Sequence, residues 1–341
     1  MKLHLIYTPF TGVGVHGGFR GDEWFKDRIL LFKDYCLKSL RNQTNKDFIH
    51  WISFRAEEKD HLFVRGLDEY LTGLYYPHIF TFDGLMYIDD KFVNYGLISK
   101  LRNILQMFRD DVFNRSFHPF SYYKKYAWDN KNDSLVERVH SSLSVIREKA
   151  SDTTDWVYLT RIDSDDMLGS RAIELIQTQE PKERRALVFE KGYILNKETN
   201  QLADWNPPTN PPFHTIIFPG KVFWNAALHL AYYRDFRSHE DIPRLFDCVK
   251  LDESYCVLFH QKHHISTSWT SPLDKKFTNL AKYGKMEPHR GREYKPYLYL
   301  THGKNISTRW KSRSTQVKNK MIGQEYGKEE EKETILKQFG L

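Results

Sequence analysis

The chain has 341 residues, of which 40% are hydrophobic and 28% charged, and its formal net charge is +7. These values are close to those of ordinary globular domains, so they argue against a disordered or fibrous protein. The length fits one large α/β domain or two smaller ones, and the positive charge favours anionic partners such as nucleotide phosphates, nucleic acid or an anionic membrane surface.

The predicted elements of the first part of the chain alternate between strands and helices. Residues 3–7 and 48–54 read as short apolar strands, and residues 78–82 as a third. Residues 61–71 are expected to be helical. A longer helix before them is predicted by apolar residues at steps of three and four, namely Phe25, Ile29, Phe32, Cys36 and Leu40. Strand, helix, strand is the beginning of a parallel sheet.

A glycine-rich loop follows the first strand and contains the pattern Gly12-Val13-Gly14-Val15-His16-Gly17. In dinucleotide-binding folds such glycines open the next helix directly, and an acid follows the second strand. Here residues 19–22 separate the glycines from the helix, and Arg55 follows the second strand. We therefore interpret the segment as a loop that covers a ligand, with an ordinary flexible loop as the alternative.

The later elements follow the same alternation, without an internal repeat. They are expected to be helices at 95–113, 134–149 and 170–179, and strands at 156–162, 186–190 and 215–218. The cysteines lack the spacing of a disulfide framework or a zinc site, so reduced thiols are expected.

An acidic run, Asp163-Ser164-Asp165-Asp166, follows the strand at 156–162. Such a strand delivers carboxylates to the edge where open α/β sheets bind ligands. Aspartate also caps helices, which would account for one of the three, but neighbouring carboxylates repel one another unless a cation or strong donors lie among them. The run therefore predicts a Mn²⁺ or Mg²⁺ site, because these ions prefer oxygen ligands and often take only one or two carboxylates from the protein.

In three ordered segments the sequence resembles glycosyltransferases of the GT-A fold, and among them the rhamnosyltransferase family of bacteria and viruses. The first segment runs from Arg28-Ile29-Leu30-Leu31-Phe32 to Phe48-Ile49-His50-Trp51. The second is Thr160-Arg161-Ile162-Asp163-Ser164-Asp165-Asp166, the family's form of the D-x-D motif, and the third is His302-Gly303-Lys304-Asn305-Ile306-Ser307. Long unmatched stretches separate them.

The resemblance implies an α/β, Rossmann-like fold of the nucleotide-diphospho-sugar transferase type, with a mostly parallel central sheet. It also implies transfer of a sugar, such as rhamnose or another deoxyhexose, from a nucleotide-diphosphate sugar to a glycan or lipid-linked glycan. The metal would be bound by Asp163 and Asp165, with Asp165 the more direct ligand, and by His302 from a late loop. Without the resemblance, a histidine before glycine is more often an ordinary loop residue.

The resemblance further implies that Arg28, Arg161 and Asp163 lie at the donor phosphates or nucleotide, and that Asp166 faces the donor sugar. An arginine next to aspartates also serves as their ion-pair partner in many proteins, so a structural role for Arg161 is the alternative.

An inverting transfer needs a base to take the proton of the acceptor hydroxyl as it attacks the anomeric carbon. Ser238-His239-Glu240-Asp241 is similar to the x-E-D element of inverting GT-A enzymes. We choose Asp241 as the base, with Glu240 as the second choice. Ser238 and Asp241 also fit the start of a helix, so capping is the alternative.

We expect a GT-A domain over residues 1–310, with a nucleotide-sugar-binding half at 1–166 and an acceptor-binding half at 167–310. Residues 311–341 would form a basic, charged tail with a closing helix, which is solvated or, alternatively, contacts a membrane surface. Because the sequence has neither a signal-peptide pattern nor an apolar segment of spanning length, we expect a cytoplasmic protein whose membrane association would be peripheral.

Two other classes of function are alternatives. Residues 120–128 interleave aromatic rings with lysines, as single-strand nucleic-acid surfaces do, which would suit a nucleic-acid-binding protein or a metal nuclease. The glycine pattern would suit a nucleotide-dependent oxidoreductase. The transferase interpretation expects no nucleic-acid partner.

Overall fold

The chain divides into two compact units in the computed structural model. Unit 1 consists of Met1–Leu31, Asp47–Ser164 and Phe218–Ser238, and unit 2 of Phe32–Lys46, Asp165–Ile217 and His239–Leu341. The structure describes residues 1–11, 22–55, 58–82, 101, 105, 108, 135–150, 154–189, 191–205, 213–232, 242–252, 255–258, 295–301 and 322–341.

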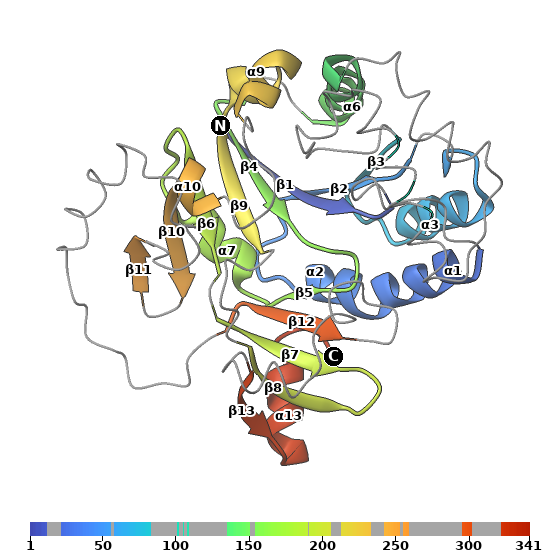
Figure 1. The fold of residues 1–341 in the computed structure, drawn as a ribbon, viewed down its shortest axis with the longest axis vertical. Coiled ribbons are helices and arrows are strands. Elements are labelled where there is room, and N and C mark those ends of the chain that lie inside the picture. The colour runs from blue at the N-terminus through green and yellow to red at the C-terminus, as the bar shows by residue number, and fades with distance from the viewer. Residues whose placement is uncertain are drawn as a thin grey trace. The chain divides into compact units, whose positions relative to one another are not determined.

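Unit 1 is built on parallel strands in the order β4-β1-β2-β3, as Figure 1 shows. Their bounds are β1 Lys2–Pro9, β2 Ile49–Ser53, β3 His78–Thr81 and β4 Trp156–Arg161. Every residue of β1 from His4 onward is buried, as expected for a parallel strand covered on both faces.

Helices cover this sheet. They are α1 Asp22–Leu31, α3 Leu62–Gly73, α6 Leu135–Lys149, α8 Gly220–Phe223 and α9 Ala226–Tyr232. Helix α1 packs against α3, and α6 packs against α9. The chain passes from β2 through α3 to the parallel strand β3, which is the connection expected of a Rossmann-like fold.

Buried histidines form hydrogen bonds within the unit 1 sheet. The Nε2 atom of His4 lies 2.7 Å from Thr160 Oγ1, and Nε2 of His50 lies 2.8 Å from Thr8 Oγ1. The other ring nitrogen of His50 is 3.0 Å from the Tyr76 hydroxyl. Burial lowers the pKa of both histidines to about 3, and His78 adds to the effect at His50, so both rings are neutral at physiological pH.

Unit 2 begins within the long helical region that the apolar pattern predicts. The π-helical turn η1 Phe32–Cys36 and helix α2 Leu37–Arg41 directly follow α1, and Asn42 is the C-cap of α2. All five stripe residues are buried, with relative exposure between 0% and 8%. The helix is therefore confirmed, with a π turn that the periodicity did not predict.

The remaining helices of unit 2 are short: α7 Ala172–Gln177, α10 Ile242–Leu245 and α13 Glu329–Lys337. Its strands in the order β11-β10-β6-β9 are Tyr255–Leu258, Asp247–Asp252, Arg185–Val188 and His214–Pro219, of which the last ends in unit 1. Strand β6 is parallel to β10 and antiparallel to β9, and β11 is antiparallel to β10.

Unit 2 also contains a five-stranded sheet in the order β13-β8-β7-β12-β5, visible in the lower part of Figure 1. Its strands are β13 Ile322–Tyr326, β8 Gln201–Trp205, β7 Gly192–Asn196, β12 Tyr297–Thr301 and β5 Met167–Leu168. The sequence did not predict this sheet. The charged C-terminal region contributes to it, because β13 pairs with β8 and Phe339 beyond α13 is completely buried.

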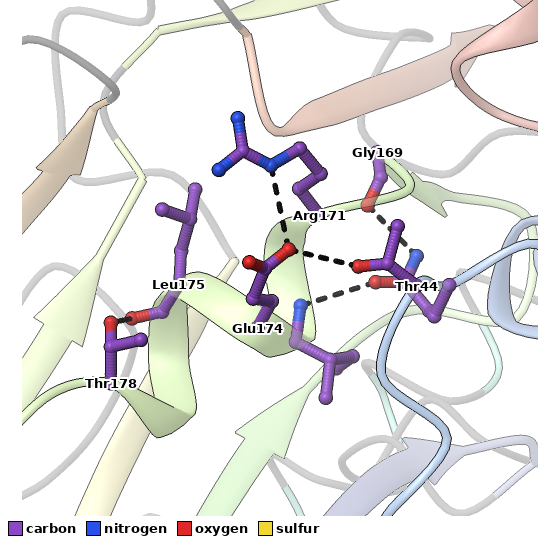
Figure 2. Close-up of polar contacts among 8 residues, drawn as sticks. Thr44, Gly169, Arg171, Glu174, Leu175 and Thr178 are labelled. Atoms are coloured by element: carbon purple, nitrogen blue, oxygen red, sulfur yellow. Dashed lines mark hydrogen bonds and ion pairs between the residues drawn. The ribbon is translucent and has the colours of Figure 1, made fainter.

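Gln43 links the helical start of unit 2 to the segment that follows β5. Its Nε2 group donates to the carbonyls of Leu168 and Gly169 at 3.2 and 2.8 Å, and its Oε1 accepts from the amide of Ile173 at 3.1 Å. Figure 2 shows the neighbouring contacts, in which Thr44 Oγ1 and Arg171 Nε both donate to Glu174 Oε2. Because Gln43 is 2% exposed, these bonds replace water for several backbone groups at once.

The expected α/β fold class with a mostly parallel central sheet is confirmed, and it is compatible with a Rossmann-like fold. Of the helix expected over 95–113 only residues 101, 105 and 108 are described, and the stretch at 120–128 lies outside the described residues.

Cys36 and Cys248 are buried free thiols, and burial raises the pKa of the Cys248 thiol. None of the described helices is both long and apolar enough to cross a bilayer.

Candidate functional site

The carboxyl ends of β1, β2 and β4 lie at one edge of the unit 1 sheet, because these strands are parallel. The backbone there is tied together by bonds from Phe10 N to Ser53 O and from Ile162 N to Tyr7 O, both at 3.0 Å. This edge is where the acidic run begins, so it is the candidate site.

The first aspartate of the run is paired with an arginine of the preceding strand. Arg161 Nη2 donates to Asp163 Oδ1 at 2.9 Å, and their side chains are 12% and 31% exposed. The pair thus lies at the surface end of β4 rather than in the core. This is the ion-pair role that the sequence left open for Arg161, and it also places a guanidinium where an anionic ligand would approach.

Arg28 reaches the same turn from α1. Its Nε donates to Ser164 Oγ at 2.6 Å, although 136 positions separate the two residues in the chain. Ser164 is completely buried, and the Arg28 guanidinium lies 6.0 Å from the centre of the Trp24 ring. Arg28, Arg161 and Asp163 therefore belong to one end of the unit 1 sheet, and the two guanidinium groups suit a phosphate-bearing ligand, whereas their contact with a donor stays a prediction.

The next two aspartates belong to unit 2 and are more deeply buried. Asp165 is 5% exposed and Asp166 is 1% exposed. Asp166 Oδ1 accepts a hydrogen bond from the amide of Leu300 at 3.1 Å, next to the pairing of β5 with β12. This bond gives Asp166 a structural role that the sequence did not suggest, and a contact with a donor sugar stays a prediction.

Glu58 is a buried carboxylate at the unit 1 edge that the sequence interpretation missed. It is 2% exposed and accepts hydrogen bonds from the Thr11 hydroxyl and, at 3.0 Å, from the Arg55 amide. It therefore connects the residues that follow β1 to those that follow β2. The available signal was an acid a few residues after the second strand, hidden in the charged run Arg55–Asp60.

Several predicted site residues lie outside the described part of the chain: His302, the base candidates Glu240 and Asp241, and the glycine loop from Gly12 onward. Among the residues that the structure describes, no group of three or more His, Cys, Asp or Glu side chains is arranged to hold a metal ion. The carboxylates of the acidic run are nevertheless the oxygen donors that Mg²⁺ and Mn²⁺ accept, and such ions often take only one or two from a protein.

Comparison with known proteins gives one match. Residues 19–62 match the model of a family described as "Putative rhamnosyl transferase". No curated protein and no solved structure matches the chain. The matched region covers α1, η1, α2 and β2, and it includes Arg28, whereas the acidic run lies outside it. In this region the chain is thus similar to a glycosyltransferase family, which agrees with the first of the three segments on which the sequence resemblance rests.

Proposed function

We propose that this protein is a glycosyltransferase of the GT-A type, which uses Mn²⁺ or Mg²⁺ to transfer a sugar from a nucleotide-diphosphate donor to a glycan or lipid-linked glycan. The proposal names rhamnose or another deoxyhexose as the sugar, in line with the family similarity at residues 19–62. Inversion at the anomeric carbon is part of the proposal.

One observation supports this proposal above the others. The hydrogen bond from Arg28 to Ser164 joins the region similar to the transferase family to the acidic run, which lies far outside that region. A sheet end with two arginines and an adjacent aspartate has the charges needed to bind a diphosphate through a divalent cation. A fold alone would not distinguish this function from others of the α/β class.

In the proposed site, Arg28 and Arg161 bind the diphosphate of the donor. Arg161 would exchange its bond with Asp163 for bonds with phosphate oxygens, which frees the carboxylate. Asp163, Asp165 and His302 are the residues that would hold the cation, which would supply positive charge to offset the charge on the leaving diphosphate. Asp166 keeps its bond to the Leu300 amide.

The acceptor hydroxyl forms a bond to the anomeric carbon as the bond from that carbon to the diphosphate oxygen breaks. Its proton passes to the carboxylate of Asp241, or of Glu240 as the second choice, and the nucleoside diphosphate is the leaving group.

A thermal-shift panel tests the proposal. Thymidine, uridine and guanosine diphosphate sugars are compared with and without Mn²⁺, and release of nucleoside diphosphate is measured for each donor that binds. We expect at least one donor to raise the melting temperature only with Mn²⁺, since a ligand that binds the folded state stabilises it.

The variant Asp165→Asn should lose both the Mn²⁺-dependent shift and the release of nucleoside diphosphate while the protein stays folded. Asp68→Asn, which alters an exposed aspartate of α3 beside His78, is the matched control and should behave as wild type. Full release of nucleoside diphosphate by the Asp165→Asn variant, or a panel in which no donor raises the melting temperature, would refute the proposal.

A further inference from the structure

The five-stranded sheet of unit 2 has one face that carries aromatic and uncharged polar side chains. Residues paired across neighbouring strands, and residues two apart along a strand, share a face. The register pairs Gly192 with Trp205, Ile194 with both Tyr299 and Ala203, and Asn196 with both Thr301 and Gln201. On β7, β8 and β12 this face consists of Gly192, Ile194, Asn196, Gln201, Ala203, Trp205, Tyr297, Tyr299 and Thr301, and the flanking strands add Leu168 of β5, which pairs with Tyr297, and Glu325 of β13, which pairs with Ala203.

Two stacked aromatic pairs lie at one end of this face. The Phe213 and Tyr297 rings are 4.1 Å apart at their centres and 20° from parallel, and both side chains are buried. The Trp205 and Tyr299 rings are 5.7 Å apart and 13° from parallel, and both residues are partly exposed. The first pair is thus the buried part of this face, whereas the second pair presents aromatic surface at its boundary with solvent.

Gly192 makes this arrangement possible. A β carbon at Gly192 would lie 2.2 Å from Cε2 of Tyr297, so the Tyr297 ring occupies the space that a side chain would fill. The absence of a side chain at this position lets the aromatic rings of β8 and β12 approach across β7.

Beside the aromatic pairs runs a row of amide and hydroxyl groups from Asn196, Gln201 and Thr301. Asn196 Oδ1 accepts from the amides of Glu198 and Thr199, and Thr301 Oγ1 donates to the Leu195 carbonyl at 3.3 Å. None of the nine residues that β7, β8 and β12 contribute to the face is charged. Glu325, which pairs with Ala203 from the edge strand β13, adds a carboxylate at the border.

The opposite face of the same sheet has a different character. There Tyr193 packs against the buried Phe339 ring with centres 6.1 Å apart, and Asp204 accepts a hydrogen bond from the Tyr326 hydroxyl and pairs with Lys295. This face thus carries the packing of the C-terminal residues and the charged pair. The aromatic face is the side on which neutral polar groups and flat rings come together.

We propose that the aromatic face, centred on Trp205 and Tyr299, binds a pyranose ring of a neutral glycan, which is the acceptor if the proposed transferase function holds. The apolar C–H face of a pyranose stacks on an indole or phenol ring, and its hydroxyls bond to amide and hydroxyl groups at the border. A phosphate-rich ligand such as a nucleic acid would need cations on this face, and the border carries Glu325 instead.

Saturation-transfer NMR with simple sugars tests the proposal without any donor or metal. The probes are methyl glycosides of rhamnose, glucose and galactose at millimolar concentration, with a single-stranded oligonucleotide measured in parallel. We expect saturation of the ring C–H protons of at least one glycoside, and no saturation of the oligonucleotide. The Trp205→Ala and Tyr299→Leu variants should each reduce the glycoside signal at least tenfold.

Tyr75→Ala is the matched control, because this residue is an aromatic side chain with 96% exposure on unit 1. It should leave the glycoside signal unchanged. Trp205→Phe keeps an aromatic ring and should retain most of the signal, which separates loss of stacking from loss of folding. Unchanged signals in Trp205→Ala and Tyr299→Leu, saturation of the oligonucleotide in place of the glycosides, or no saturation of any glycoside would each overturn the proposal.

These outcomes are independent of the donor experiment. A Mn²⁺-dependent donor shift without glycoside binding would refute the acceptor face and leave the transferase function standing. Glycoside binding that depends on Trp205, without any donor shift, would support the carbohydrate-binding face and remove its assignment as an acceptor site.

Discussion

Acidification is expected to destabilise unit 1 through its buried histidines. His4, His50 and His229 are completely buried, and burial lowers their pKa to about 3, 3 and 4, from 6.5 in the unfolded chain. Below pH 6.5 the unfolded chain therefore binds protons that the folded protein does not bind. The free energy of unfolding must fall as the pH decreases from 6.5 towards the folded-state pKa.

The size of the effect follows from linkage. At pH 5 an unfolded histidine with a pKa of 6.5 is almost fully protonated, whereas the folded one is neutral, so each residue costs about 2 kcal/mol. Three such residues amount to about 6 kcal/mol, which is comparable to the 5–15 kcal/mol total stability of an ordinary domain. The loss begins near pH 6.5 and continues below pH 5, by about 1.4 kcal/mol per pH unit for each histidine, down to the folded-state pKa of about 3 or 4.

Urea unfolding at pH 7.5 and at pH 5, followed by circular dichroism, measures this loss. His50→Gln should be less stable at pH 7.5, because it breaks the bonds to Thr8 and Tyr76, but its loss on acidification should be about 2 kcal/mol smaller than in wild type. His140→Gln, which removes an exposed imidazole from α6, is the control. An equal loss in wild type and His50→Gln would refute the reasoning.

Three further changes test packing and the candidate site. Gly220→Ala should destabilise by about 2–3 kcal/mol in urea unfolding, because its β carbon would lie 1.9 Å from the carbonyl oxygen of Thr154 and the backbone would have to shift. Gln43→Leu should cost about 3 kcal/mol or more, since it removes the acceptor of the Ile173 amide and the donor of two carbonyls. Arg28→Met should abolish the Mn²⁺-dependent donor shift while changing the free energy of unfolding by only about 1 kcal/mol, and a normal shift would contradict its proposed role.

The fold of unit 1 could be predicted from local patterns. The strands β1 and β4 are short apolar segments, and the helical stripe that starts at Phe25 in unit 1 and continues to Leu40 in unit 2 repeats at the spacing of one helix face. These signals arise within ten or twenty residues, so they are readable before any long-range contact is known.

The five-stranded sheet of unit 2 lacks such signals. Strand β5 has only two residues, and β7 begins with Gly192, a residue type that normally argues against a strand. Only the structure shows that the Tyr297 ring occupies the space of a side chain at this position. Strand β13 contains glycine and polar residues and is held by pairing with β8. The turn before β8 uses Asn200 with a φ of 51°, a residue type that tolerates this conformation and that could have suggested a hairpin.

The candidate site was predicted in part. The position of the acidic run at a strand end follows from the apolar segment before it, and Arg28 was identified through the family resemblance. The role of Glu58 could not be read from the sequence, because it accepts a hydrogen bond from Thr11, a residue far from it in the chain. A charged residue within a charged run normally lies in solvent, and only the tertiary contact reverses that expectation.

The three aspartates of the acidic run differ in what relieves their mutual repulsion. Asp163 is neutralised by Arg161, and Asp166 accepts the amide of Leu300, so protein groups already offset part of the repulsion from which a cation was first inferred. The resemblance assigns the direct metal ligand to Asp165, so the metal proposal depends most on this residue. Asp166→Ala should destabilise unit 2 by about 1–3 kcal/mol and keep the Mn²⁺-dependent donor shift. Asp165→Asn should lose that shift. Loss of the shift in Asp166→Ala at temperatures where that variant is folded would mean that the carboxylate of Asp166 contacts the donor or the cation after all.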